Sequence, residues 1–185
     1  MATKFDGEFT VATPLEDAYA VLSETQNFAP LLPSYQSHEL KEDGSAVVKI
    51  KVGVGKIRGT AKVNLTLEES EAPVRARYSG KGTVMSGVFN IVAAFELEDA
   101  GRGETRVKWQ GELVMFGKLV SMAGGMIKPI AQRDIGRMIA AIQAALGGEV
   151  EVVPVPEPGV SPVAKLRALW KKLVSLVRGL LRKRK

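Results

Sequence analysis

Side chains that could perform acid–base or nucleophilic chemistry are few and scattered in this chain. There is no cysteine, which excludes disulfides, thiolate metal sites and a cysteine nucleophile. The only histidine, His38, lies between Ser37 and Glu39, where an imidazole is more often a surface residue than a base. No spaced set of His, Asp and Glu offers the convergent ligands of a metal site. The sequence therefore predicts a non-catalytic protein with no metal.

The glycine-rich stretch Gly53-Val54-Gly55-Lys56 superficially suggests phosphate binding. It lacks the spacing of a Walker A site and the Ser or Thr that should follow the lysine. Turns between strands favour glycine because it reaches positive φ without steric cost. A turn is therefore the better interpretation of this stretch.

Methionines are a stronger signal. Three of them, Met115, Met122 and Met126, lie close together in the sequence beside Gly124-Gly125. Methionine is flexible and often lines adaptable apolar sites, although it also simply fills cores. Whether these residues line a pocket depends on the elements that position them.

Those elements are a run of strands and a long helix. Apolar and polar residues alternate in several segments, as in Val48, Ile50, Val52 and Val54 with lysines between them, which indicates an antiparallel sheet with one buried face. We expect strands at 4–13, 34–42, 45–55, 58–70, 74–83, 86–98 and 103–116.

Helices are expected after the first strand and after the last. Thr13 and Pro14 predict a helix start, with Thr13 as the N-cap. Residues 118–146 predict one long helix, which Gly124-Gly125 and Pro129 loosen or kink. Gly80 and Gly82, inside an expected strand, suggest a bulge or bend.

This order of elements predicts an α+β protein of the helix-grip class, in which a curved antiparallel sheet wraps around a long C-terminal helix in a domain spanning 1–146. We expect an apolar pocket between sheet and helix. One lip would be formed by Phe28, Leu31, Leu32 and Tyr35. The sheet side would carry Phe89, Ile91, Phe95, Trp109, Leu113 and Met115. The helix side would carry Met122, Met126 and Ile130.

A Gly- and Pro-rich linker, 147–161, separates this domain from a basic tail, 162–185. The tail carries a charge of +9, whereas the rest of the chain carries −3. On a helical wheel its apolar residues share one face and its basic residues the other, as in helices that lie on anionic membranes. A partner's groove is a second possible target, and nucleic acid a third that the wide apolar face disfavours. The predicted membrane-binding residues are Leu166, Leu169, Trp170, Leu173, Leu176, Val177 and Leu180, with Lys171, Lys172 and Arg178.

The chain contains no run of about 18 uncharged apolar residues, so any membrane contact would be peripheral. The N-terminal residues carry charges where a secretion signal needs an apolar run. Together these features predict a cytoplasmic protein bound peripherally to the inner face of the cell membrane.

Four stretches carry a resemblance to a known family: FDGEFTVATPLEDAYAVLSETQNFAPLLP, KVGVGKIRGTAKVNLTLEE, YSGKGTVMSGVFNIVAAFELED and GETRVKWQGELVMFGKLVSMAGGMI. The more specific pieces are Gly-Lys-Ile-Arg-Gly-Thr, Tyr-Ser-Gly-Lys-Gly and Phe-Gly-Lys-Leu. In them the chain resembles the CoxG family of carbon monoxide dehydrogenase subunits, which belongs to the SRPBCC superfamily, also called START-like or Bet v 1-like.

The resemblance implies a deep apolar cavity and a non-catalytic role beside a molybdenum-containing carbon monoxide dehydrogenase. It implies recruitment of that enzyme to the membrane and binding of a lipophilic quinone of the menaquinone or ubiquinone type, with no tightly required cofactor. Two alternatives remain open. An enzyme acting on a hydrophobic substrate would need a polar group inside the cavity, for which Glu112 and Asn90 are the candidates. A pure assembly factor would have a cavity filled by its own side chains.

Overall fold

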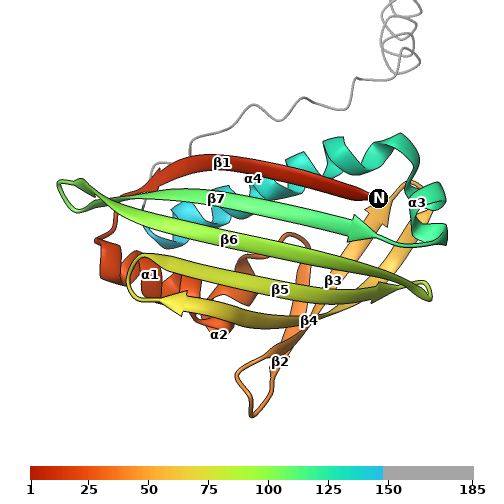
Figure 1. Cartoon of the computed structure of the whole chain (residues 1–185), viewed down its shortest axis with the longest axis horizontal. Helices are drawn as coiled ribbons and strands as arrows, with labels where there is room; N and C mark the ends of the chain where they lie inside the picture. The colour runs from red at the N-terminus through yellow and green to blue at the C-terminus, as the bar shows by residue number, and fades with distance from the viewer. Residues whose placement is uncertain (148–185) are drawn as a thin grey trace, which may run out of the picture. The chain divides into compact units, whose positions relative to one another are not determined.

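The computed structural model describes residues 1–147, and the predicted linker beyond Gly147 and the predicted tail lie outside them. Seven antiparallel strands form one curved sheet in the order β1-β7-β6-β5-β4-β3-β2 (Figure 1). Their bounds are β1 (Ala2–Val11), β2 (Tyr35–Leu40), β3 (Ala46–Val54), β4 (Ile57–Glu71), β5 (Arg75–Val84), β6 (Gly87–Gly101) and β7 (Glu104–Met115).

The helices follow β1 and β7, as the sequence predicts. The first group is α1 (Leu15–Ser23), α2 (Thr25–Phe28) and the 3-10 turn η1 (Ala29–Leu31). The second is α3 (Lys118–Ala123), the 3-10 turn η2 (Gly124–Met126) and α4 (Ile127–Ala145). In Figure 1, α4 runs behind β1 and β7, while α1 and α2 lie toward one end of the strands. The curved antiparallel sheet with a C-terminal helix confirms the predicted fold class in its main features.

Alternating polarity selects the buried face of the sheet. In β4, Ala61, Val63 and Leu65 are buried, whereas Lys62 and Asn64 between them are exposed. Fully burying a large apolar side chain contributes about 1.5–3 kcal/mol, and a shift of one residue would turn the whole apolar set to water. The pattern therefore fixes the register as well as the strand.

The predicted helix over 118–146 is interrupted at Gly124-Gly125, where the sequence predicts that it is loosened or kinked. The chain leaves α-helical geometry there and forms η2, because two consecutive glycines have low helix propensity. The turn between β3 and β4 packs against this point, where the Lys56 N–H donates to the Met122 carbonyl at 3.2 Å. Pro129 lies in the first turn of α4, where its missing N–H removes no helix hydrogen bond.

Thr13 is not the N-cap of α1, contrary to the expectation from its sequence context. Pro14 holds that position, and no side chain caps the helix. The Thr13 hydroxyl donates instead to the carbonyl of Leu146, and its own carbonyl accepts a 2.7 Å hydrogen bond from Thr105. Thr13 thus links the start of α1 to the end of α4 and to β7.

No bulge occurs at Gly80 or Gly82, because the pairing of β4 with β5 is continuous through both. The register shift in this pair lies between Leu67 and Glu69. The two glycines instead make room for large side chains of the neighbouring strand β6.

Buried side chains divide into two clusters along the strands. We call the first the packed end; it centres on Phe28, Tyr78 and Phe95 and includes residues of α1. The Phe28 ring stacks on Tyr78 with centroids 4.8 Å apart and meets Phe95 edge-on at 5.5 Å. We call the second the cavity end; its buried residues are Ile57, Ala61, Val63, Val84, Phe89, Met115, Leu119, Ala123 and Ile127.

Candidate functional site

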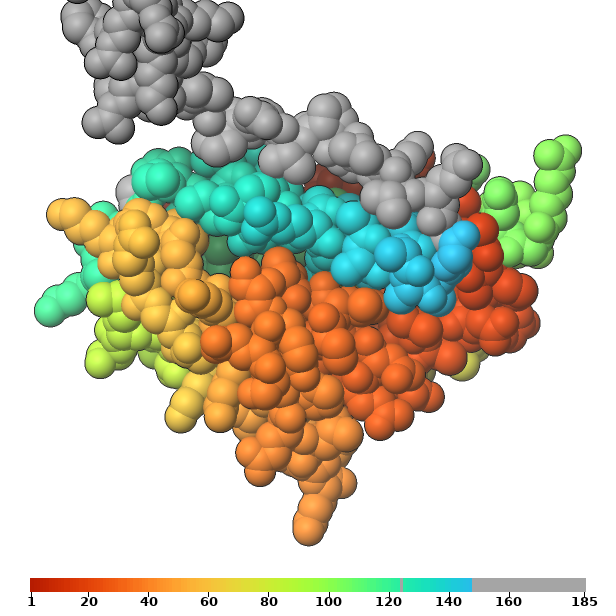
Figure 2. Space-filling model, turned by 180° about the vertical axis from the view of Figure 1, so that it is seen from behind, coloured from red at the N-terminus to blue at the C-terminus, as the bar shows by residue number. Residues whose placement is uncertain are grey.

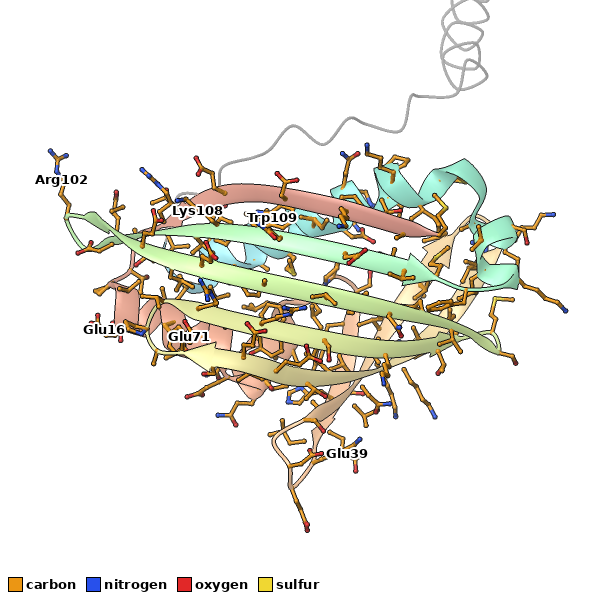
Figure 3. All side chains as sticks on the ribbon, in the orientation of Figure 1. Glu16, Glu39, Glu71, Arg102, Lys108 and Trp109 are labelled. Carbon is orange, nitrogen blue, oxygen red and sulfur yellow. The ribbon has the colours of Figure 1, made fainter. Side chains whose placement is uncertain are left out.

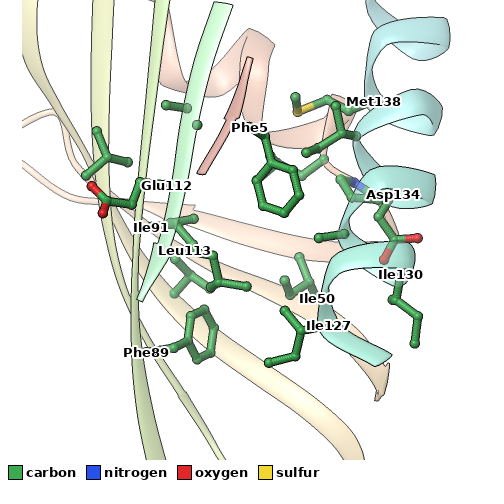
Figure 4. Close-up of a pocket in the computed structure, with 18 of the residues that line it drawn as sticks. Phe5, Ile50, Phe89, Ile91, Glu112, Leu113, Ile127, Ile130, Asp134 and Met138 are labelled. Atoms are coloured by element: carbon green, nitrogen blue, oxygen red, sulfur yellow. The ribbon is translucent and has the colours of Figure 1, made fainter. Parts of the chain in front are cut away.

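A cavity of about 300 Å³ lies between the concave face of the sheet and α4 (Figure 4). From behind, Figure 2 shows a hollow between α4 and the strands around β3. Lining residues come from six of the seven strands, from the segment after η1, and from α3 and α4. They include Phe5, Leu32, Ile50, Val52, Val54, Ile57, Val63, Val84, Phe89, Ile91, Phe95, Trp109, Leu113, Met115, Leu119, Ile127, Ile130, Ala131, Asp134, Ile135 and Met138.

All six predicted sheet-side residues meet on this wall. They alternate along β6 and β7, so their side chains share the concave face. Leu32 joins them from the segment after η1 and Ile130 from α4. The predicted residues brought together here are Leu32, Phe89, Ile91, Phe95, Trp109, Leu113, Met115 and Ile130.

The other predicted residues lie outside the wall. Phe28 is fully buried in the aromatic stack of the packed end, and Leu31 and Tyr35 pack against the same cluster. The Tyr35 hydroxyl is hydrogen-bonded to Nδ1 of His38 at 2.8 Å, and His38 is half-buried. Met122 packs beside the cavity end, and Met126 is exposed because η2 turns it outward.

Sequence reasoning missed two groups of lining residues. Ile50, Val52 and Val54 alternate cleanly along β3, and that pattern alone could have placed them on the wall. Ile135 and Met138 lie one turn apart on α4, and Phe5 reaches the cavity from β1 (Figure 4). The position of Phe5 depends on the pairing of β1 with β7, which no local pattern reveals.

Glycines on the inner face explain why the cavity end is hollow. A Cβ atom on Gly82 would lie 2.0 Å from the Phe89 ring, and one on Gly80 would lie 2.5 Å from Ile91. The large residues of β6 therefore rest on β5 instead of projecting across the cavity. The Trp109 indole lies over Gly7 of β1 in the same way, 3.0 Å from the position of a Cβ atom.

The wall carries few polar groups. The Nε1–H of Trp109 is buried and has no hydrogen-bond partner among the described residues. The Asp134 carboxylate, on α4, accepts hydrogen bonds of 2.9 and 3.0 Å from the Arg133 guanidinium and lies 3.6 Å from Arg137. A buried donor without a partner is costly to the folded protein.

Glu112 is among the residues that line the cavity, but neither candidate for catalysis points its side chain into it. The Glu112 carboxylate points to the side of the sheet away from α4 (Figure 4). Asn90 lies between Phe89 and Ile91, which both line the cavity, so strand alternation puts its side chain on the outer face. Within residues 1–147 there is also no cluster of three or more potential metal-binding side chains. The wall is suited to holding an apolar molecule.

Residues 7–147 match the family model that describes CoxG, a subunit of carbon monoxide dehydrogenase. This match covers most of the chain and nearly all of its described part. The chain belongs to the CoxG family. No curated protein matches its sequence.

Solved structures similar to this CoxG-family protein share its fold. A conserved protein from Geobacillus kaustophilus is 16% identical with a TM-score of 0.68, over 78% of this chain and 95% of that one. A START superfamily protein from Mycobacterium smegmatis is 12% identical with a TM-score of 0.57, over 78% and 97%. The Zhui aromatase/cyclase from Streptomyces sp. R1128 is 16% identical with a TM-score of 0.58, over 80% and 94%. These likenesses establish the START-like fold.

Spanning a bilayer requires a helix that is both long and apolar along its whole length. Among the helices of residues 1–147, none meets both requirements.

Proposed function

We propose that this protein binds a lipophilic molecule of the quinone type in its cavity and serves a molybdenum-containing carbon monoxide dehydrogenase at the membrane, without catalysing a reaction itself. The observation that carries the proposal is the cavity between the sheet and α4, whose lining is almost wholly apolar. Family membership supports the choice of enzyme partner.

The cavity fits a quinone ring in size and chemistry. Its volume of about 300 Å³ lies at the lower end of typical ligand pockets. The ring would rest against Phe89, Ile91 and Leu113, where burial of apolar surface drives binding. A quinone carbonyl oxygen is an acceptor, and the Trp109 indole supplies the donor. The rest of a prenyl chain would leave through the hollow between α4 and β3.

Membrane recruitment is assigned to the basic tail, 162–185. Leucines and Trp170 would enter the interface, and each lysine or arginine near an anionic surface would add about 1 kcal/mol. The two contributions suffice for reversible attachment. They also predict that salt weakens binding, because screening reduces the electrostatic part.

Two experiments test this proposal. First, a lipid extract of the gently purified full chain is analysed by mass spectrometry, and we expect a co-purified prenyl quinone. The Ala131→Phe variant should lose it, since Ala131 lines the cavity, whereas Ala144→Phe on the exposed side of α4 should retain it. Absence of any prenyl lipid from the unmodified protein would favour a pure assembly role.

Second, co-sedimentation with vesicles compares the full chain with a version that ends at Glu157. The full chain should bind anionic vesicles and release them in high salt, and the truncated version should not sediment. Equal sedimentation with neutral vesicles would contradict the electrostatic part of the proposal.

A further inference from the structure

Large apolar side chains are exposed at the cavity end of the domain. Met85, Val88, Phe116 and Met126 each expose about half of their surface, between 47% and 53%. Met85 lies in the turn between β5 and β6, and Val88 is the second residue of β6. Phe116 follows β7, and Met126 is the last residue of η2. A soluble surface rarely gathers large apolar residues in one place without an interaction to explain them.

Backbone contacts hold these segments together. The Phe116 N–H donates to the Val88 carbonyl at 3.2 Å, and the Arg58 N–H approaches the Met85 sulfur at 3.3 Å. The turn between β3 and β4 joins the group through Lys56 and the Met122 carbonyl. The exposed residues lie on or next to these linked segments of the cavity end, and together we call them the apolar rim: Met85, Val88, Phe116 and Met126.

In the segments that contain the apolar rim, every charged residue is a Lys or Arg. Residues 44–67, 72–95 and 113–133 contain no Asp or Glu. Within residues 1–147, the exposed cations beside the rim form no ion pair; they are Lys56, Arg58, Lys118 and Lys128. Carboxylates concentrate instead toward the packed end, where Figure 3 labels Glu16 and Glu71.

Each rim residue is next in sequence to a residue of the cavity wall. Val84 precedes Met85, Phe89 follows Val88, and Met115 precedes Phe116. Ile127 follows Met126 in the same manner. One side of each short segment therefore faces the cavity and the other faces solvent. Only the backbone of that segment would separate a lipid at the rim from the cavity wall.

From these observations we propose that the apolar rim docks on an anionic lipid bilayer, with Met85 and Phe116 at the depth of the headgroups and the cations on lipid phosphates. Docking would bring the cavity end of the domain against the lipid phase. This proposal rests on the proposed function, because it says how the domain meets the membrane from which the lipophile comes. Met85 and Ser86 both have positive φ in a two-residue turn between paired strands, so the rim is preorganised.

The absence of cysteine allows a depth measurement on the full chain. A Met85→Cys variant carries an environment-sensitive fluorophore, and Val74→Cys is the matched control. Val74 is also apolar and 44% exposed, but it precedes β5 whereas Met85 follows it, about 36 Å away at the usual rise per residue. With anionic vesicles containing brominated lipids, the Met85 probe should be quenched and blue-shifted, and the Val74 probe should not.

Several outcomes would overturn the proposal. One is a Met85 probe that stays in water while the chain co-sediments; the tail would then bind alone and the proposed function would survive. Equal quenching of both probes would indicate nonspecific adsorption. A probe shielded without vesicles, by self-association or by an added acidic protein, would identify a protein as the occupant. If the full chain bound no vesicles, both proposals would fail.

A second variant tests the consequence for lipid transfer. Met85→Ser together with Phe116→Ser, in the full chain, should leave co-sedimentation within about twofold but slow extraction of quinone from vesicles by about tenfold. Val74→Ser is the control, and equal midpoints of thermal unfolding exclude misfolding. Unchanged extraction by the double variant would contradict the proposal even if the tail binds as expected.

Discussion

The packed end and the cavity end are built on the same strands yet have opposite interiors. On the inner face of β5, Ala76 and Tyr78 lie at the packed end, whereas Gly80 and Gly82 lie at the cavity end. Tyr78 meets Phe28 from α2 and fills its space, and burial raises the pKa of its phenol well above the usual range. At Gly80 and Gly82, the side chains of β6 pack against the backbone of β5 and leave the cavity unfilled. The comparison shows that a few positions on one strand separate a filled core from a cavity.

The same two ends differ in charge. Toward the packed end, Glu71, Arg75 and Glu96 form ion pairs across β4, β5 and β6, and Lys108 pairs with Glu98. Beside the apolar rim, cations stand without carboxylates in the same segments. Paired charges satisfy one another in water, whereas unpaired cations attract an anionic surface. The two ends thus differ both in the packing of their interiors and in the charge of their surfaces.

The largest expected effect is a difference in stability between the two interiors. Phe28→Ala should lower the free energy of unfolding by about 3–5 kcal/mol, because it removes a ring from a filled aromatic cluster. Leu113→Ala should cost only about 1–2 kcal/mol, because Leu113 already borders empty space. Chemical denaturation of the full chain measures both. Equal losses would show that the cavity wall is as tightly packed as the core.

The next effect concerns the glycines that keep the cavity open. Gly82→Ala should cost about 1–3 kcal/mol, because its Cβ would overlap the Phe89 ring and drive it into the cavity. Gly53→Ala on β3 is the matched control, since nothing lies within 4 Å of its Cβ position. Adding Phe89→Leu to Gly82→Ala should recover part of the loss, which a double-mutant cycle detects. Additive losses would mean that the two residues do not compete for space.

A smaller effect isolates the polar group of the cavity. Trp109→Phe keeps most of the apolar surface but removes the unpartnered N–H, so affinity for a quinone should fall about three- to tenfold. Affinity for a hydrocarbon of similar size should not change. Titration by calorimetry measures both ligands. A parallel loss for the hydrocarbon would assign the effect to packing instead of the hydrogen bond.

The smallest effect concerns the exposed pair at the packed end. The hydrogen bond from Lys108 lowers the pKa of the Glu98 carboxyl, and the same bond raises the pKa of the Lys108 ammonium. A depressed carboxyl pKa contributes stability that is present above the unfolded-state pKa and is lost as pH falls through the folded-state pKa. Lys108→Met should therefore lower the melting temperature slightly near about pH 7 and hardly at all near about pH 2. A difference that grows in acid would contradict this sign.

Much of the fold could be predicted locally. Alternation in β3, β4 and β7 identifies the strands and their buried faces, because side chains on a strand alternate regardless of what packs on them. The same rule places Phe89, Ile91 and Leu113 on the inner face. The alternation rule does not show where along the strands the helices fill the interior. Phe28 is therefore predicted to line the cavity but lies in the core.

The sequence by itself determined the alternation of polarity along the strands, the helix-grip class and the separation of an acidic body from a basic tail, since each depends on residues that are neighbours in the chain. Only the tertiary structure decided that Phe89 and Ile91 rest on Gly82 and Gly80, and that Met85, Phe116 and Met126 form one rim. These relations join residues from different elements. They depend on strand register and on the docking of α3 and η2, which no local pattern encodes.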